Sequence, residues 1–375
     1  MRTIITHLFL LLSVSTAKRS TNIVILLADD FGYSDLAVYG SPSQEFGHLD
    51  QLALDGVRFT SWLAPESVCT PSRAALQTGR LPIRTGMIPE YPPPAGDGSG
   101  EENRVLSVID SGGLPKNETS IADLVKERGY KTGFVGKWHG GINGKYNGKV
   151  VNGEHLPSRH GYDYVGLNLP FTNHWDCDET TNHKPAPSVE QCLLYSGDEL
   201  IQQPIDHSNL TAAFAADATA FIKNSASSED PFLLFFGFAQ MHVSMFSSPA
   251  FNGTSKNGVY GDGVREMDWA AGQILQSLRT AGILDDTMVV FTRGEERAGG
   301  GEPGVIYFAC ISPIILFTEH TFADNPNPPF YLPLYSTFSS YLSLAIMALI
   351  LSSASRVVAP VLSEEGKGTL AGRVV

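Results

Sequence analysis

The sequence predicts an α/β protein built around a mostly parallel sheet. Two uninterrupted apolar runs, at residues 23–28 and 232–236, are typical of strands that are covered on both faces. Segments with the apolar spacing of helices alternate with such strands up to residue 292. The chain has 375 residues and is 42% hydrophobic, which is enough apolar material for one large core. We therefore expect one large α/β domain, or one domain plus an appendage, with the alternating pattern over residues 21–292.

The first elements follow from the N-terminal third. The strand at residues 23–28 ends in Asp29 and Asp30, and open α/β sheets keep their active sites at the carboxyl ends of such strands. A helix with leucines at helical spacing follows and ends at Gly56. The next helix has a proline near its start and Gly79 at its end. Cys69 therefore lies at or just before a helix N-terminus.

The later elements repeat this alternation. A helix capped by Thr119 or Ser120 runs to Arg128, and a strand then reaches Val135. Residues 140–215 are predicted to be rich in loops. A long amphipathic helix precedes the strand at residues 287–292, and one side of it carries Val264, Met267, Ile274, Leu275 and Leu278.

The charge of the chain excludes one class of function. The formal net charge is −13, and no block rich in lysine and arginine is present. Because the affinity of proteins for a phosphate backbone depends on such charges, we expect no nucleic-acid partner.

The N-terminus predicts entry into the secretory pathway. Arg2, an apolar run and small residues up to Ala17 form a signal-peptide pattern over residues 1–17. A buried first helix is the alternative, and it is disfavoured because a strand begins directly afterwards. Three glycosylation sequons agree with passage through the endoplasmic reticulum, at Asn117, Asn209 and Asn252.

The four cysteines divide into two groups. Cys177 and Cys192 bracket a polar loop that contains proline, which makes them the expected disulfide pair. Cys69 and Cys310 remain. They can pair with each other, or Cys69 can be a buried structural thiol, but the residues around Cys69 favour a different role.

Five ordered blocks resemble the sulfatase family. They are "NIVILLADDFGYSDL", "CTPSR" with "TGR" five residues later, "GKWH", "MHVSMF" and "YGDGVREMDWAAGQIL". The resemblance implies an alkaline-phosphatase-like α/β sandwich, in which helices flank a central mixed and mostly parallel sheet. The family's C-terminal subdomain is not recognisable, so we expect this fold to be incomplete at the C-terminus.

The resemblance gives Cys69 a chemical role. In sulfatases the corresponding cysteine is oxidised to formylglycine by a formylglycine-generating enzyme in the endoplasmic reticulum. The hydrated aldehyde attacks sulfur through one hydroxyl and expels sulfate through the other. Asp29 and Asp30, together with the modified Cys69, are implied to bind calcium, which prefers several oxygen ligands. Without the resemblance, two acids after a strand are more often a helix cap or loop acids.

Further site residues are carried over from the same blocks. Arg73 is implied to support the hydrate, Lys137 to bind sulfate oxygens and His139 to hold a hydroxyl of the hydrate. Lys137 and His139 alternate along an extended segment and are expected to face the same side. His242 resembles the histidine that contacts substrate and protonates the leaving alcohol. Thr172 is expected near the sulfate.

The resemblance fails after residue 292. The family places an Asp-Asn pair there, in a T-S-D-N-G turn, whereas this chain continues with Arg293, Gly294, Glu295 and Glu296. Glu295 is a candidate replacement ligand. We therefore expect a sulfuric ester hydrolase of the arylsulfatase type, acting on a sulfate ester of a small molecule or carbohydrate. The alternative is a catalytically impaired or inactive relative. A phosphodiesterase of the same superfamily is disfavoured, because those enzymes use serine or threonine as nucleophile.

Residues 293–375 form a divergent tail. Residues 325–355 contain no charged side chain. A membrane-spanning helix, a buried core segment and non-native sequence from a mis-joined gene model are the three interpretations. Membrane association through residues 335–355 is disfavoured because the apolar run is shorter than the roughly 20 residues of a membrane span. The expected location is the lysosome or the cell exterior.

Overall fold

The computed structural model describes residues 20–32, 34–59, 64–66, 68–87, 106, 112–142, 153–171, 192–242 and 245–293, with the backbone of a strand at 315–317. The predicted signal peptide and residues 335–355 lie outside this part of the chain, as do Thr172, Cys177, Glu295 and Cys310. Among the described residues, no helix has the length and apolar character needed to cross a membrane.

A single nine-stranded sheet forms the centre of the described fold, in the order β2-β9-β8-β1-β7-β3-β4-β5-β6. The strands are β1 (Asn22–Ala28), β2 (Val57–Arg58), β3 (Lys131–Lys137), β4 (Tyr164–Leu169), β5 (Leu194–Ser196), β6 (Glu199–Gln202), β7 (Phe232–Gly237), β8 (Thr287–Arg293) and β9 (Ile315–Phe317). Strands β8, β1, β7, β3 and β4 are parallel neighbours, and the outer strands pair antiparallel. The predicted mixed and mostly parallel sheet is confirmed.

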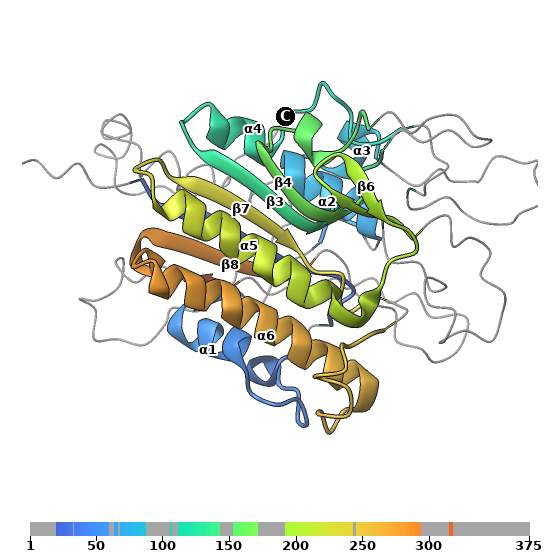
Figure 1. The fold of residues 1–375 in the computed structure, drawn as a ribbon, viewed down its shortest axis with the longest axis vertical. Coiled ribbons are helices and arrows are strands. Elements are labelled where there is room, and N and C mark those ends of the chain that lie inside the picture. The colour runs from blue at the N-terminus through green and yellow to red at the C-terminus, as the bar shows by residue number, and fades with distance from the viewer. Residues whose placement is uncertain are drawn as a thin grey trace, which may run out of the picture.

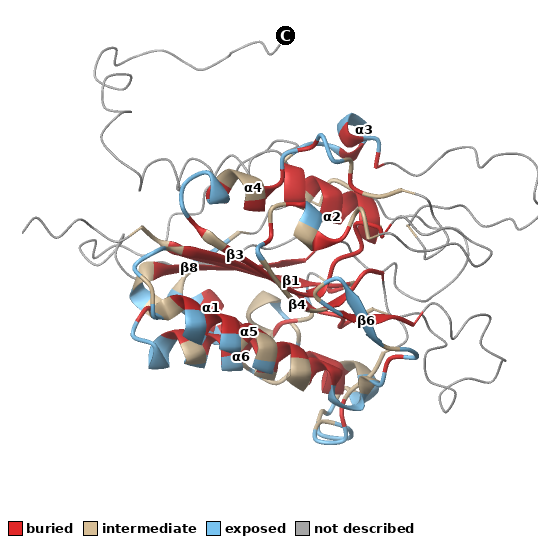
Figure 2. Ribbon diagram, turned by 45° about the horizontal axis from the view of Figure 1, so that its top comes forward, coloured by how far each residue is buried: buried red, intermediate tan, exposed pale blue. Residues whose placement is uncertain are grey.

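Helices cover both faces of this sheet (Figures 1 and 2). They are α1 (His48–Asp55), α2 (Cys69–Thr78), α3 (Pro82–Thr85), α4 (Ile121–Lys126), α5 (Leu210–Ala226) and α6 (Gly258–Thr280). Short 3-10 turns are η1 (Ala37–Tyr39), η2 (Pro157–Arg159), η4 (His207–Asn209) and η5 (Leu284–Asp286). Figure 2 shows α1, α5 and α6 on one side of the buried sheet and α2, α3 and α4 on the other.

The first strand explains how the two layers are held. All seven residues of β1 are buried. Val24, Leu26 and Ala28 pack into the core beneath α5 and α6, whereas Ile23 and Leu27 join the core beneath α2 and α4. Because side chains alternate along a strand, a continuous apolar run supplies both cores at once.

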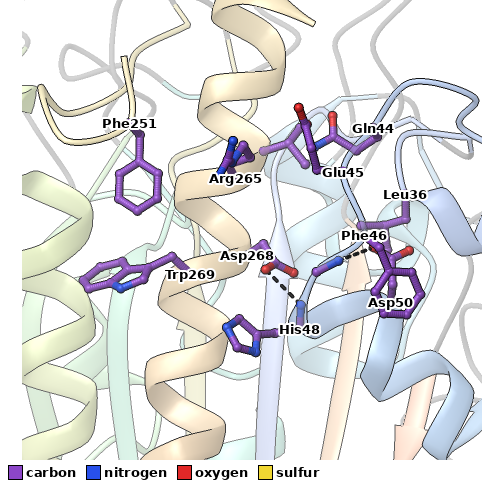
Figure 3. A pocket seen from close by; sticks show the side chains of 12 residues that line it. Leu36, Gln44, Glu45, Phe46, His48, Asp50, Phe251, Arg265, Asp268 and Trp269 are labelled. Atoms are coloured by element: carbon purple, nitrogen blue, oxygen red, sulfur yellow. Dashed lines mark hydrogen bonds between the residues drawn. The ribbon is translucent and has the colours of Figure 1, made fainter. Parts of the chain in front are cut away.

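One carboxylate fixes α1 against α6. Asp268 on α6 accepts hydrogen bonds from the backbone nitrogens of His48, at 2.9 Å, and Leu49, at 2.8 Å. These nitrogens belong to the first turn of α1, where backbone N–H groups have no carbonyl acceptor within the helix. Figure 3 shows this contact at the wall of a hollow that is also lined by Phe251 and Trp269. None of the predicted site residues lines that hollow.

Two regions differ from the sequence-based expectation. The predicted loop-rich region 140–215 contains β4, β5, β6 and the start of α5. The helix at residues 210–226 was not predicted at all. Within the described residues, the predicted helix up to Arg128 is shorter, because α4 ends at Lys126 and Gly129 then takes a left-handed conformation with φ 81°.

Candidate active site

The candidate site lies where four neighbouring parallel strands end. Asp29 and Asp30 follow β1, Lys137 is the last residue of β3, and Arg293 is the last residue of β8. His242 follows β7. Because parallel strands end at one edge of the sheet, residues separated by more than 200 positions meet there.

Cys69 reaches this edge from α2. It is the first residue of that helix and is 6% exposed. The helix ends at Gly79, whose φ of 66° is a left-handed conformation that glycine adopts readily. A helix N-terminus favours negative charge, so the fold places Cys69 where an anionic group is stabilised.

A buried ion-pair network lies beneath Cys69. The carboxylate of Asp29 pairs with the guanidinium of Arg73 at 3.0 Å and also contacts the ammonium of Lys137. A second guanidinium nitrogen of Arg73 donates to the backbone oxygen of Lys137 at 2.8 Å. These three side chains are 0 to 3% exposed. One carboxylate therefore balances two buried cations.

Asp30, Cys69 and His242 form a second group. A carboxylate oxygen, the sulfur and a ring nitrogen lie within 4.8 Å of one another. The Asp30 Oδ2 to His242 Nε2 distance is 3.9 Å. Burial raises the pKa of Asp30, and the negative charge of Asp29 raises it further. His242 and the nearby cations oppose that rise.

Backbone contacts hold the two carboxylates in place. The nitrogen of Asp29 donates to the oxygen of Gln240 at 2.9 Å, and the nitrogen of Met241 donates to the oxygen of Asp29 at 2.5 Å. Asp30 has a φ of 48°, a left-handed conformation that is costly for a residue with a side chain. This conformation turns the chain sharply after β1 and brings the Asp30 carboxylate toward His242.

His139 is held differently from the sequence-based expectation. The strand ends at Lys137, and His139 has a φ of 56°, so the expected extended alternation does not continue to it. Its Nε2 lies 2.9 Å from the backbone oxygen of Leu106. Burial, reinforced by the charge of Lys137, lowers the pKa of His139 well below its usual value. Its Nδ1 is buried, and it has no hydrogen-bond partner among the described residues, so it is available to a ligand.

The glycine before Lys137 is required by a close approach of two strands. A Cβ on Gly136 would lie 1.9 Å from the backbone oxygen of Gly237 in β7, and the φ of Gly136 is 96°. Both features exclude a larger residue. The glycine therefore allows β3 to deliver Lys137 to the Asp29 carboxylate.

Arg293 completes the described part of the site. It is 4% exposed, and its guanidinium donates to the backbone oxygen of Phe31, which follows Asp30. The sequence predicts an arginine charge beside the expected metal position. The structure adds that the strand includes Arg293, which pairs with Ala28 in register.

The donor set bears on the calcium that the family resemblance implies. The carboxylates of Asp29 and Asp30 supply the hard oxygen ligands that calcium prefers. The Asp29 carboxylate is already paired with two cations. A calcium ion that binds this carboxylate would have to displace them or share it with them. The predicted replacement ligand, Glu295, and the predicted sulfate contact, Thr172, lie outside the described residues.

Comparison with known proteins identifies the family. The sulfatase family model matches residues 21–300. The chain belongs to the sulfatase family. An arylsulfatase of Hemicentrotus pulcherrimus is 45% identical over 270 residues, which are 72% of this chain and 46% of that protein. Arylsulfatase A of Homo sapiens is 36% identical over 73% of this chain and 52% of its own length. The chain thus spans about half the length of the curated relatives it matches.

Solved structures agree on the fold. A sulfatase of glycosaminoglycan metabolism from Bacteroides thetaiotaomicron has a TM-score of 0.69 and 23% identity, covering 89% of this chain and 78% of that one. Ps i-CgsB, solved with a neocarrahexaose, has a TM-score of 0.67 and 20% identity, covering 90% and 73%. The predicted alkaline-phosphatase-like arrangement is confirmed for the described part of this sulfatase.

Proposed function

We propose that this sulfatase hydrolyses sulfuric esters of aryl or carbohydrate alcohols, with Cys69 converted to formylglycine. The observation that carries the proposal is the convergence of Cys69, Asp30 and His242 within 4.8 Å at the carboxyl edge of the sheet. The family match and the arylsulfatase relatives support the reaction type. Water and the ester are consumed, and an alcohol and sulfate are released.

Formylglycine and calcium each have a defined place in this proposal. Formylglycine at position 69 would supply an oxygen nucleophile, and Asp29 and Asp30 would hold a calcium ion that would neutralise negative charge on the sulfate. The residues fit these roles in type, because two carboxylates and a buried helix N-terminus meet there.

The chain's own residues orient the ester and move its protons. Lys137 and Arg73 carry buried positive charge, which stabilises sulfate oxygens more strongly than the same charge does in water. Burial and the charge of Lys137 lower the pKa of His139, so that its ring is neutral. Its Nδ1 can then form a hydrogen bond with a hydroxyl at position 69, either as acceptor or as donor. His242 is 14% exposed, and its Nε2 holds the proton that the leaving alcohol oxygen receives.

The proposal is tested by assay and mass spectrometry on the same protein. The full chain is secreted from cells that contain the modifying enzyme, and hydrolysis of an aryl sulfate is followed with calcium present. Cys69→Ala is the matched variant. Loss of turnover in this variant, with an aldehyde at position 69 of the unsubstituted chain, supports the proposal. Equal turnover in both proteins contradicts it.

A catalytically impaired sulfatase is the second candidate, and Arg293 favours it. This buried cation contacts the backbone directly after Asp30, where its charge opposes a bound calcium ion. Calcium titration of the converted protein separates the two candidates. An aldehyde at position 69 without measurable calcium binding or turnover supports the impaired protein.

We also propose passage through the secretory pathway to the lysosome or the cell exterior. The three sequon asparagines, Asn117, Asn209 and Asn252, are all exposed, as glycosylation requires. Cys192 is fully buried, and its proposed disulfide partner is Cys177. Peptide mapping before and after glycosidase and reductant treatment tests both modifications.

A further inference from the structure

Three metal-binding atoms meet beside the ion-paired Asp29. They are a carboxylate oxygen of Asp30, the sulfur of Cys69 and a ring nitrogen of His242, all within 4.8 Å of one another. Zinc bonds to sulfur at about 2.3 Å and to nitrogen or oxygen at about 2.0–2.2 Å, so tetrahedral ligand atoms lie roughly 3.3–3.6 Å apart. The 3.9 Å between Asp30 and His242 is already close to this range. Small side-chain movements therefore form a tetrahedral site.

The chemistry of these donors selects against calcium. Calcium typically takes roughly 6–8 oxygen ligands, and a thiolate sulfur or an imidazole nitrogen is not one of them. One sulfur, one nitrogen and one oxygen are ligands that zinc accepts, with a fourth position left for water. The side chains of Asp30 and His242 are each 14% exposed, which leaves a path for that water.

The backbone holds these ligands in position before a metal binds. Asp30 and His242 follow β1 and β7, which are parallel neighbours. The hydrogen bonds of Asp29 with Gln240 and Met241 join the segments that follow these two strands. Cys69 is fixed by its position as the first residue of α2, which places its sulfur beside the Asp30 carboxylate and the His242 ring.

Zinc binding at this trio leaves the neighbouring ion pairs intact. Asp29 is not one of the three ligands, so its contacts with Arg73 and Lys137 persist. A calcium ion that uses Asp29 must instead compete with both cations for the same carboxylate. The trio is therefore the less costly place for a divalent cation while residue 69 is a thiol.

We propose that the chain with an unmodified Cys69 binds one zinc ion through Asp30, Cys69 and His242. The atom at position 69 then selects the metal: sulfur selects zinc, and an oxygen-bearing side chain removes the zinc ligand. The inference concerns the thiol form and does not require the hydrolase activity proposed above. Its failure and the failure of the hydrolase proposal are therefore separate results.

The test uses the full chain secreted from cells that lack the modifying enzyme, with the thiol at position 69 verified by mass spectrometry. Chelator-treated protein is titrated with cobalt as a spectroscopic probe and with zinc by calorimetry. We expect one metal ion per chain and a thiolate-to-cobalt charge-transfer band. Loss of a direct ligand in Cys69→Ser, Asp30→Asn or His242→Gln weakens zinc binding by more than about 100-fold, since even indirect partners contribute 10- to 100-fold.

Matched controls separate this site from adventitious binding. His48→Gln replaces an exposed histidine outside the trio and should leave the zinc affinity unchanged. Circular dichroism verifies that each variant is folded, and two of the three ligand variants suffice for the conclusion if one fails to fold. The proposal is overturned if the folded chain binds no zinc. It is also overturned if the ligand variants bind zinc as tightly as the unsubstituted chain.

Discussion

The carboxylate of Asp29 and the guanidinium of Arg73 form an ion pair of 3.0 Å between side chains that are 0% and 3% exposed. The pair joins the end of β1 to α2, the helix that begins with Cys69. Lys137 contacts the same carboxylate from β3. Three elements that carry site residues are thus tied together by one buried anion.

Removing that anion should destabilise the fold strongly. Asp29→Ala removes the carboxylate that two buried cations share, and breaking a buried pair in this way costs about 3–5 kcal/mol. The free energy of unfolding of chelator-treated protein, measured by urea denaturation, checks this. Asp163→Ala is the control, because its pair with Lys126 is half exposed and such pairs contribute about 0–1 kcal/mol. Similar losses in the two variants would contradict the account.

His160 predicts a loss of stability at acid pH. Burial lowers its pKa from 6.5 to about 4. In the unfolded chain His160 binds a proton below about pH 6.5, whereas in the folded chain it does so only below about pH 4. The free energy of unfolding therefore falls as the pH falls from 6.5 to about 4. From this residue alone we expect a loss of about 2 kcal/mol between pH 7 and pH 5.

The check for His160 is denaturation at both pH values. His160→Phe replaces the ring with one that does not titrate, and it should reduce the pH-dependent loss by about 2 kcal/mol. If the free energy of unfolding falls as much between pH 7 and pH 5 in His160→Phe as in the unsubstituted chain, another group binds the proton.

His242 predicts a dependence on the leaving group. If its Nε2 protonates the departing alcohol, His242→Gln lowers kcat by roughly 100- to 10,000-fold for an ester of a weakly acidic alcohol. The loss should be much smaller for a nitrophenyl ester, whose leaving group needs no proton. Turnover of the two esters by the converted protein gives the comparison, with His48→Gln, an exposed residue, as control. The same loss for both esters argues against this role.

Arg293 predicts a gain of calcium affinity on substitution. Arg293→Ser removes a buried positive charge near the two carboxylates and should tighten calcium binding by about tenfold, which is about 1.4 kcal/mol. Calorimetric titration of the converted protein measures this. Arg58→Ser is the matched control, because Arg58 also donates to a backbone oxygen but lies exposed. No change in the Arg293 variant would mean that this cation does not oppose the metal.

The sequence predicted the parts of the fold that local patterns determine. The apolar run of β1 needs burial on both faces, and Gly79 ends the helix that begins at Cys69, as expected. Strands β5 and β6 were missed because they have only three and four residues, and most of the β6 residues are exposed, so they carry no apolar pattern. The family resemblance, rather than any periodicity, supplied the site residues.

The contacts within the site could not be predicted from local patterns. Lys137 meets Asp29 across 108 positions of sequence, and Leu106 bonds to His139 through its backbone oxygen, an atom that every residue type carries. The left-handed conformations of Asp30 and His139 are likewise unexpected for residues with side chains. Such strain is common where a site constrains the backbone.

Hydrolysis by a formylglycine at position 69 is tested most directly when residue 69 and the turnover are determined in one preparation. The full chain is secreted from cells with the modifying enzyme, the peptide containing Cys69 is weighed, and aryl sulfate hydrolysis is measured with calcium. We predict the lighter aldehyde at position 69 and a turnover that rises in proportion to the converted fraction and is abolished in Cys69→Ala. Turnover that is independent of conversion, or a fully converted protein that hydrolyses no sulfate ester, would contradict it.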